Sequence, residues 1–77
     1  MSPLYAIVDV DICVRAGLTP GAVARAYLAG GARLLQLRAK QLSSGALLRL
    51  VDEIAKDVRG AGGRLIVNDR EIGRAHV

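Results

Sequence analysis

The sequence has no tryptophan, no phenylalanine and only two tyrosines, Tyr5 and Tyr27, among its 77 residues. Proteins that bind nucleic acid combine dense basic clusters with aromatic side chains on which bases stack, and this chain offers neither. Its net charge of +4 and pI near 10.0 therefore favour small anionic ligands over nucleic acid as binding partners.

Cysteine and long apolar runs are also scarce. Cys13 is the single cysteine, which fits a reducing cytoplasm and excludes an internal disulfide. No apolar stretch approaches the roughly 20 residues that a membrane helix needs. The first apolar run is broken by Asp9 before it reaches the length of a signal peptide. We expect a cytoplasmic protein that does not bind membranes.

The beginning of the chain predicts a strand followed by a helix. Residues 4–8 are apolar and partly β-branched, which is typical of a strand covered on both faces. A loop holding Cys13 and Gly17 follows. The Thr-Pro pair at 19–20 then predicts a helix start, and the glycine pair at 30–31 predicts its end. Helical spacing predicts a single buried stripe, made of Ala22, Val23, Ala26 and Tyr27.

A second strand, a second helix and a third strand complete the pattern. Residues 33–38 predict the strand, and Ser43 or Ser44 is expected to cap a helix that ends at Gly60. Residues 64–67 predict the third strand. The apolar stripe expected on this helix is Leu47, Val51, Ile54 and Val58.

The order strand, helix, strand, helix, strand predicts a parallel sheet with right-handed crossovers. A doubly wound sheet would usually carry a glycine-rich phosphate loop after its first strand, and the sequence has no such motif. We therefore predict an α/β fold, the N-terminal βαβαβ portion of an incomplete (β/α)8 TIM barrel. Three parallel strands leave two unpaired edges, so we expect the chain alone to be poorly folded or prone to aggregate.

Polar side chains follow the second and third strands. Gln36, Arg38 and Lys40 alternate along one face of the second strand, and Asn68, Asp69 and Arg70 follow the third. Cations and amides at one edge of a parallel sheet predict a phosphate site, and the carboxylate predicts a metal. The simpler interpretation is a polar strand face and a surface turn. Asp9 and Asp11 follow the first strand, where we expect them to cap backbone amides rather than bind a ligand.

These motifs, in this order, resemble the thiamine-phosphate synthase family. The resemblance rests on QLRAK at 36–40 and VNDR at 67–70, supported by LYAIVD at 4–9 and GGA at 30–32. It implies a transferase that joins hydroxymethylpyrimidine diphosphate to a thiazole phosphate, giving thiamine phosphate and pyrophosphate with Mg²⁺. It further implies that Arg38 and Lys40 are catalytic, that both bind substrate together with Gln36 and Asn68, and that Asp69 ligates Mg²⁺.

The resemblance ends at Arg70, and the remaining residues read EIGRAHV. Back-translated as GAG ATC GGA AGA GCA CAC GTC, they reproduce a widely used short-read sequencing adapter after one leading G. We therefore expect residues 1–70 to be the N-terminal third of a thiamine-phosphate synthase-like barrel and residues 71–77 to be a non-native tail from adapter read-through. Since the family's other site residues are missing, we expect this fragment to be inactive by itself.

Two alternatives to the synthase stay open. The related thiazole tautomerase shares the barrel and much of the QLRAK motif, although Asn68 and Asp69 together favour the synthase. An orphan half-barrel without catalytic activity could instead bind phosphate weakly or assemble through its strand edges. The sequence leaves the oligomeric state undetermined.

Overall fold

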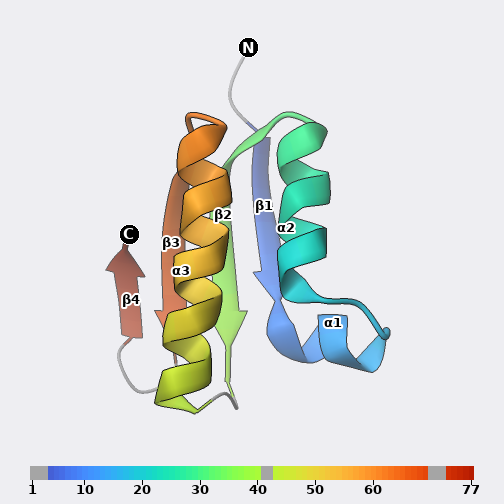
Figure 1. Ribbon diagram of the computed structural model, residues 1–77, viewed down its shortest axis with the longest axis vertical. Helices are drawn as coiled ribbons and strands as arrows, with labels where there is room; N and C mark the ends of the chain where they lie inside the picture. Colours follow the sequence, from blue (N-terminus) through green and yellow to red (C-terminus); the bar gives the residue numbers. More distant parts are fainter. Residues whose placement is uncertain (1–3, 41–42, 70–72) are drawn as a thin grey trace.

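The computed structural model describes residues 4–40, 43–69 and 73–77, which form one sheet covered by helices. The sheet has the order β1-β2-β3-β4, with β1, β2 and β3 parallel and β4 antiparallel to β3. Figure 1 shows α2 and α3 side by side on the same face of this sheet. In chain order the elements are β1 (Leu4–Asp9), α1 (Val10–Arg15), α2 (Pro20–Ala29), β2 (Ala32–Ala39), α3 (Ser44–Gly60), β3 (Arg64–Asp69) and β4 (Gly73–His76).

The three parallel strands are neighbours in the order in which they occur along the chain. This excludes the doubly wound order in which the first strand lies between the second and the third. A (β/α)8 barrel repeats the arrangement found here, with each crossover helix on the outer face of the strands it connects. The predicted parallel sheet with βαβ crossovers is therefore confirmed.

The central strand β2 alternates between a covered face and an open face. Leu35, Leu37 and Ala39 are buried in the core, whereas Arg38 is half-buried and Lys40 is exposed. Because successive strand residues point to opposite faces, the apolar set faces the helices and the charged set faces the other way. The large side chains that are fully buried come from β1, β2, β3 and α3. They are Val8, Leu35, Leu37, Leu65, Ile54 and Val58.

The two long helices begin and end where capping residues predict. The Thr19 hydroxyl accepts a hydrogen bond from the Ala22 N–H at 3.3 Å, and the Ser43 hydroxyl accepts one from the Ala46 N–H at 3.3 Å. After α2, Gly31 adopts a φ of 106°, a conformation that glycine enters without steric cost. Within the described ranges, no helix combines the length and the apolar character needed to cross a membrane.

The buried stripe of α2 differs from the predicted one. Gly21, Ala24 and Leu28 are buried. Of the predicted residues, Val23 is half-buried and packs against the core, whereas Ala22 and Ala26 are exposed, as is Tyr27 at 42%. Gly21 is covered by the side chain of Glu53 of α3, whose Oε1 atom would lie 2.8 Å from a Cβ at this position. Glycine has little hydrophobicity, so the helical spacing of apolar residues predicted the adjacent stripe through Ala22 and Ala26 instead. In α3, by contrast, Leu47, Ile54 and Val58 are buried as predicted, and Val51 is half-buried.

The segment after β1 contains a helix where a loop was predicted. Helix α1 has six residues, and Val10 and Cys13 form its buried face. Six residues are less than two turns, which is too short for periodicity to reveal. Helix formation here depends on the cap at Asp9 and on packing against the end of the sheet.

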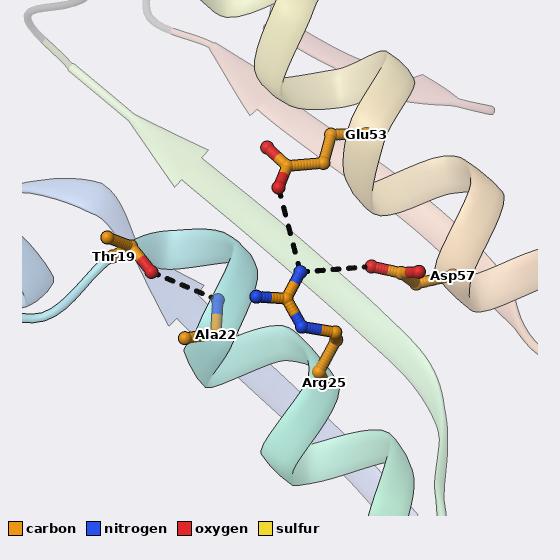
Figure 2. Close-up of polar contacts among 5 residues, drawn as sticks. All are labelled: Thr19, Ala22, Arg25, Glu53 and Asp57. Carbon is orange, nitrogen blue, oxygen red and sulfur yellow. Dashed lines mark hydrogen bonds and ion pairs between the residues drawn. The ribbon is translucent and has the colours of Figure 1, made fainter.

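Arg25 of α2 contacts two carboxylates of α3, as Figure 2 shows. Its Nη1 atom lies 3.6 Å from Glu53 Oε1 and 3.5 Å from Asp57 Oδ2. The side chains of Arg25 and Glu53 are more than half exposed, and exposed ion pairs contribute about 0–1 kcal/mol each. The contact therefore adds little to stability, most of which comes from burial of the apolar faces of the two helices.

Strand β4 corrects the prediction of two unpaired edges. It pairs with β3 through the register Ile66↔His76 to Asp69↔Gly73, so the outer edge of β3 is occupied, whereas no strand in the described ranges pairs with the outer edge of β1. The strands of a (β/α)8 barrel are all parallel. An antiparallel strand at this position therefore departs from the barrel pattern.

Gly63, just before β3, provides a test of how closely the chain packs against β2 and α3 at this point. A Cβ at Gly63 would lie 2.7 Å from the Arg33 carbonyl oxygen and 3.2 Å from Val58 Cγ1. We expect Gly63→Ala to lower the free energy of unfolding by about 1–3 kcal/mol, because the backbone of β2 must move to admit the methyl group. Urea denaturation followed by far-UV circular dichroism measures this change.

Gly60→Ala is the matched control for this substitution. Nothing lies within 4 Å of a Cβ at Gly60, the last residue of α3, so alanine there is expected to leave stability unchanged or raise it by about 0.5–1 kcal/mol. Equal unfolding midpoints for the two variants would show that the approach of Gly63 to β2 does not limit stability.

Candidate functional site

The carboxyl ends of the three parallel strands meet at one end of the sheet, the lower end in Figure 1. Asp9 of β1 is the register partner of Arg38 of β2, which is in turn the partner of Asn68 of β3. Adjacent strands lie about 4.8 Å apart, so these three residues form one row across the sheet. The site therefore combines groups that are far apart in the sequence.

A pocket of about 380 Å³ opens at this end of the sheet. The described residues that line it are Arg38, Ala39, Lys40 and Asn68. Three of the four were predicted as site residues. Ala39 lies between the two cations in the sequence, but it is buried on the strand face that packs against the helices, and nothing in its chemistry predicted it as a site residue.

The predicted residue Gln36 lies one step further from the mouth. It is the register partner of Ile7 on one side and Ile66 on the other, and only 6% of it is exposed. Among the described residues it is the one buried polar or charged member of the interior. An amide buried between aliphatic neighbours is costly unless it is hydrogen-bonded, so Gln36 is an unusual residue for this position in the strand.

The electrostatics of the pocket are dominated by positive charge. The ion pairs recorded in the described part of the chain all involve Arg25, so no described carboxylate lies within 4.0 Å of the Arg38 or Lys40 nitrogens. Arg38 is half-buried, where screening by water is weaker than at the open surface. The arrangement favours an anion with several oxygens, since a guanidinium binds two of them at once.

Asp9 is near this charge but is engaged locally. Its Oδ1 atom accepts a hydrogen bond from the Ile12 N–H at 3.2 Å, which caps α1. Asp11 lies in the first turn of the same helix, where a carboxylate is favoured by the helix dipole. The prediction that Asp9 would cap a nearby amide is confirmed.

The predicted metal ligand can be placed only by its backbone. Asp69 is the last residue of β3 and the register partner of Ala39 and Gly73, while its side chain lies outside what the structure describes, as does Arg70. In the described ranges no three His, Cys, Asp or Glu side chains gather closely enough to hold a metal.

Comparison with known proteins identifies relatives of this chain. The sequence profile of the family described as thiamine monophosphate synthase matches residues 4–72. A thiamine-phosphate synthase of Methanocella arvoryzae is 40% identical over 67 residues, which are 87% of this chain and 31% of that relative. The chain thus spans about a third of the curated relative it matches. No solved structure matches significantly.

The predicted fold class, the opening portion of an incomplete TIM barrel, agrees with this family match and is confirmed.

The thiol beside the site is expected to be unreactive. Burial raises the pKa of the Cys13 thiol, and the nearby Asp9 carboxylate raises this pKa further. At pH 8 the folded chain therefore holds less thiolate than the unfolded chain, and iodoacetamide should alkylate it more slowly than in urea. Because the pKa of the thiol is higher in the folded state, the neutral thiol favours folding at lower pH. This contribution to stability is lost as pH rises through the folded-state pKa.

Asp9→Asn tests the origin of the effect. Asparagine still offers an oxygen to cap α1 but removes the charge, so alkylation of the folded variant should be faster than that of the parent chain. Mass spectrometry of quenched samples gives both rates. Identical rates for folded and unfolded parent chain would contradict the assignment of a buried, protonated thiol.

Proposed function

The chain belongs to the thiamine monophosphate synthase family, and from this premise we propose that it is the N-terminal portion of a thiamine-phosphate synthase acting in the cytoplasm. The observation that carries the proposal is the pocket at the carboxyl ends of β2 and β3, lined by Arg38, Lys40 and Asn68. In barrels of parallel strands this end holds the catalytic residues. The family match and the position of the pocket thus point to the same chemistry.

The proposed reaction transfers a pyrimidine methylene group from diphosphate to a nitrogen atom. The carbon–oxygen bond to the diphosphate of hydroxymethylpyrimidine diphosphate breaks, and its electron pair leaves with pyrophosphate. The ring nitrogen of a thiazole phosphate forms the new carbon–nitrogen bond, giving thiamine phosphate. Negative charge therefore grows on the departing diphosphate, which is where a catalyst must supply positive charge.

Arg38 and Lys40 are the proposed source of that charge. The planar guanidinium of Arg38 can bind two phosphate oxygens, and Lys40 adds a mobile point charge at the rim of the same pocket. Because both cations are in position before the bond breaks, they stabilise the transition state more than the bound substrate. We assign both residues to catalysis as well as to substrate binding.

The neighbouring amides are proposed to orient the substrate. Asn68 is the register partner of Arg38, so its amide can contact the polar edge of the pyrimidine while the diphosphate lies over the cations. Gln36 supplies a buried amide without adding charge. Asp69 would hold Mg²⁺ at the mouth, and the ion, when bound, neutralises charge on the diphosphate. With a single such carboxylate, the 77-residue chain is proposed to be inactive alone.

A chimera tests this function directly. Residues 4–69 of this chain would replace the matching segment of the Methanocella arvoryzae protein, and thiamine phosphate formation would be followed by chromatography. We expect an active chimera in which Arg38→Ala lowers kcat/KM by about 10²–10³, the loss typical of removing one group that stabilises transition-state charge.

Arg59→Ala is the control for Arg38→Ala. Arg59 is an exposed arginine in the last turn of α3, at the opposite end of the helix from the pocket, so its removal should leave kcat/KM unchanged. A folded chimera that makes no thiamine phosphate, or one in which both substitutions have equal effects, would refute the proposal.

The metal assignment has its own test in the same chimera. Asp69→Asn is expected to raise the Mg²⁺ concentration required for half-maximal activity, because an amide oxygen binds Mg²⁺ more weakly than a carboxylate. Asp52→Asn on the exposed side of α3 makes the same chemical change away from the mouth and should not alter the requirement. An unchanged Mg²⁺ requirement for Asp69→Asn would remove Asp69 from the metal site.

A further inference from the structure

We propose that Asp9 is a specificity-determining residue of the pocket at the ends of β2 and β3. Its carboxylate weakens the hold of Arg38 on an anion, so that a free diphosphate is released rather than retained. Asp9 acts without touching the ligand, and its bond to α1 keeps it from pairing with Arg38. The inference rests on the proposed function, in which Arg38 binds the diphosphate.

Asp9 and Arg38 point to the same face of the sheet. They are register partners in adjacent parallel strands, and the residues before them, Val8 and Leu37, are also partners and are fully buried in the core. The backbone of Asp9 is still extended, with φ −95° and ψ 114°, so the alternation of the strand continues through it. Since successive side chains point to opposite faces, Asp9 and Arg38 both point away from the helices.

The two charges are neighbours but do not form an ion pair. In the described part of the chain the pairs within 4.0 Å all involve Arg25, and Asp9 is not among the described residues that line the pocket. The Asp9 Oδ1 atom instead accepts a hydrogen bond from the Ile12 N–H at 3.2 Å. Helix α1 lies at the carboxyl end of β1 and contacts both β1 and β2, as Figure 1 shows. This hydrogen bond therefore holds the carboxylate beside Arg38 without letting the two groups pair.

The charge of Asp9 acts on the groups around it. Burial raises the pKa of the Cys13 thiol, and the Asp9 carboxylate raises this pKa further. A carboxylate that disfavours a thiolate on one side also disfavours an anion bound to Arg38, its register partner in the next strand. Because Asp9 is only half-buried, the repulsion is moderate and is weakened by salt.

The repulsion grows with the charge of the ligand. A diphosphate carries more negative charge than a single phosphate, so Asp9 lowers the affinity for diphosphate more. In the proposed reaction pyrophosphate must leave before the next substrate binds. Arg38 and Lys40, both at the rim of the pocket, would hold this product tightly if no carboxylate opposed them. Asp9 keeps the pocket from retaining its product.

Binding of inorganic pyrophosphate to the full 77-residue chain tests the inference. Isothermal titration calorimetry in low-salt buffer without Mg²⁺ gives the dissociation constant, and far-UV circular dichroism checks that each variant is folded. Asp9→Asn keeps an oxygen that can cap α1 and removes the charge. We expect its affinity for pyrophosphate to rise about three- to tenfold, with a smaller rise for inorganic phosphate. The gain should shrink as NaCl is added, which a purely structural effect would not do.

Asp9→Glu makes the complementary change, because it keeps the charge and disturbs the cap. Glutamate is not among the residues that favour the N-cap position, and its carboxylate extends one methylene further, which frees it to pair with Arg38. We expect this variant to bind pyrophosphate about threefold more weakly than the parent chain, or weaker still. A residue that only capped α1 would give no gain in Asp9→Asn, so opposite changes in the two variants separate the charge from the cap.

Asp52→Asn is the matched control. It changes the net charge equally, at an exposed position of α3, and should leave the affinity for pyrophosphate unchanged. Equal gains for Asp9→Asn and Asp52→Asn, or no gain for Asp9→Asn, would overturn the inference. Asp9→Ser also supplies a capping oxygen without charge, and it repeats the test if the asparagine variant does not fold.

Arg38→Ala separates the inference from the proposed function. This substitution is expected to weaken pyrophosphate binding on the order of tenfold, since it removes a charge-assisted contact. If it does so while Asp9→Asn binds as the parent chain does, the pocket binds diphosphate and the role of Asp9 is refuted. If Arg38→Ala itself binds as the parent chain does, the assignment of Arg38 fails and the inference fails with it.

Discussion

The strict alternation of β2 is the constraint on which the rest of the structure depends. This strand is paired on both sides, and every second residue is committed to the core: Leu35, Leu37 and Ala39. A register slip of one residue would bury Arg38 and expose the leucines, at a cost of several kcal/mol from the apolar burial alone. The positions of the cations are therefore set by the hydrophobic residues between them. The site is a consequence of the core.

The helices cover one face of the sheet because of the handedness of the crossovers. Both crossovers are right-handed and the chain moves steadily in one direction across the sheet, so α2 and α3 must lie on the same face. Glycine makes one close approach possible, because a Cβ at Gly63 would lie 2.7 Å from the backbone carbonyl oxygen of Arg33 in β2. The opposite face of β2 carries Arg38, which lines the pocket, so the groups proposed to bind substrate lie away from the helices.

Much of the fold could be predicted because its signals are local. The hydroxyl caps at Thr19 and Ser43, the glycine after α2 and the apolar stripe of α3 all depend on residues within a turn of each other. The features that were predicted wrongly depend on contacts between elements. Helix α1 is stabilised by its cap and by contact with the sheet, and the buried face of α2 depends on a glycine that a hydrophobicity pattern ignores. Tyr27 was predicted to be core, and it is exposed because no helix among the described residues covers the outer edge of β1.

The sequence by itself determined which groups are available and how they are spaced along each strand. Two-residue periodicity in QLRAK is a property of the polypeptide backbone, so Gln36, Arg38 and Lys40 had to share a strand face wherever that strand lay. Only the tertiary structure decided that Arg38 is the neighbour of Asn68 and Asp9, that Gln36 is buried, and that β4 pairs with the outer edge of β3 while no described strand pairs with the outer edge of β1. Those facts depend on strand order and register, which arise from burial of apolar surface between segments distant in the sequence and leave no local trace in it.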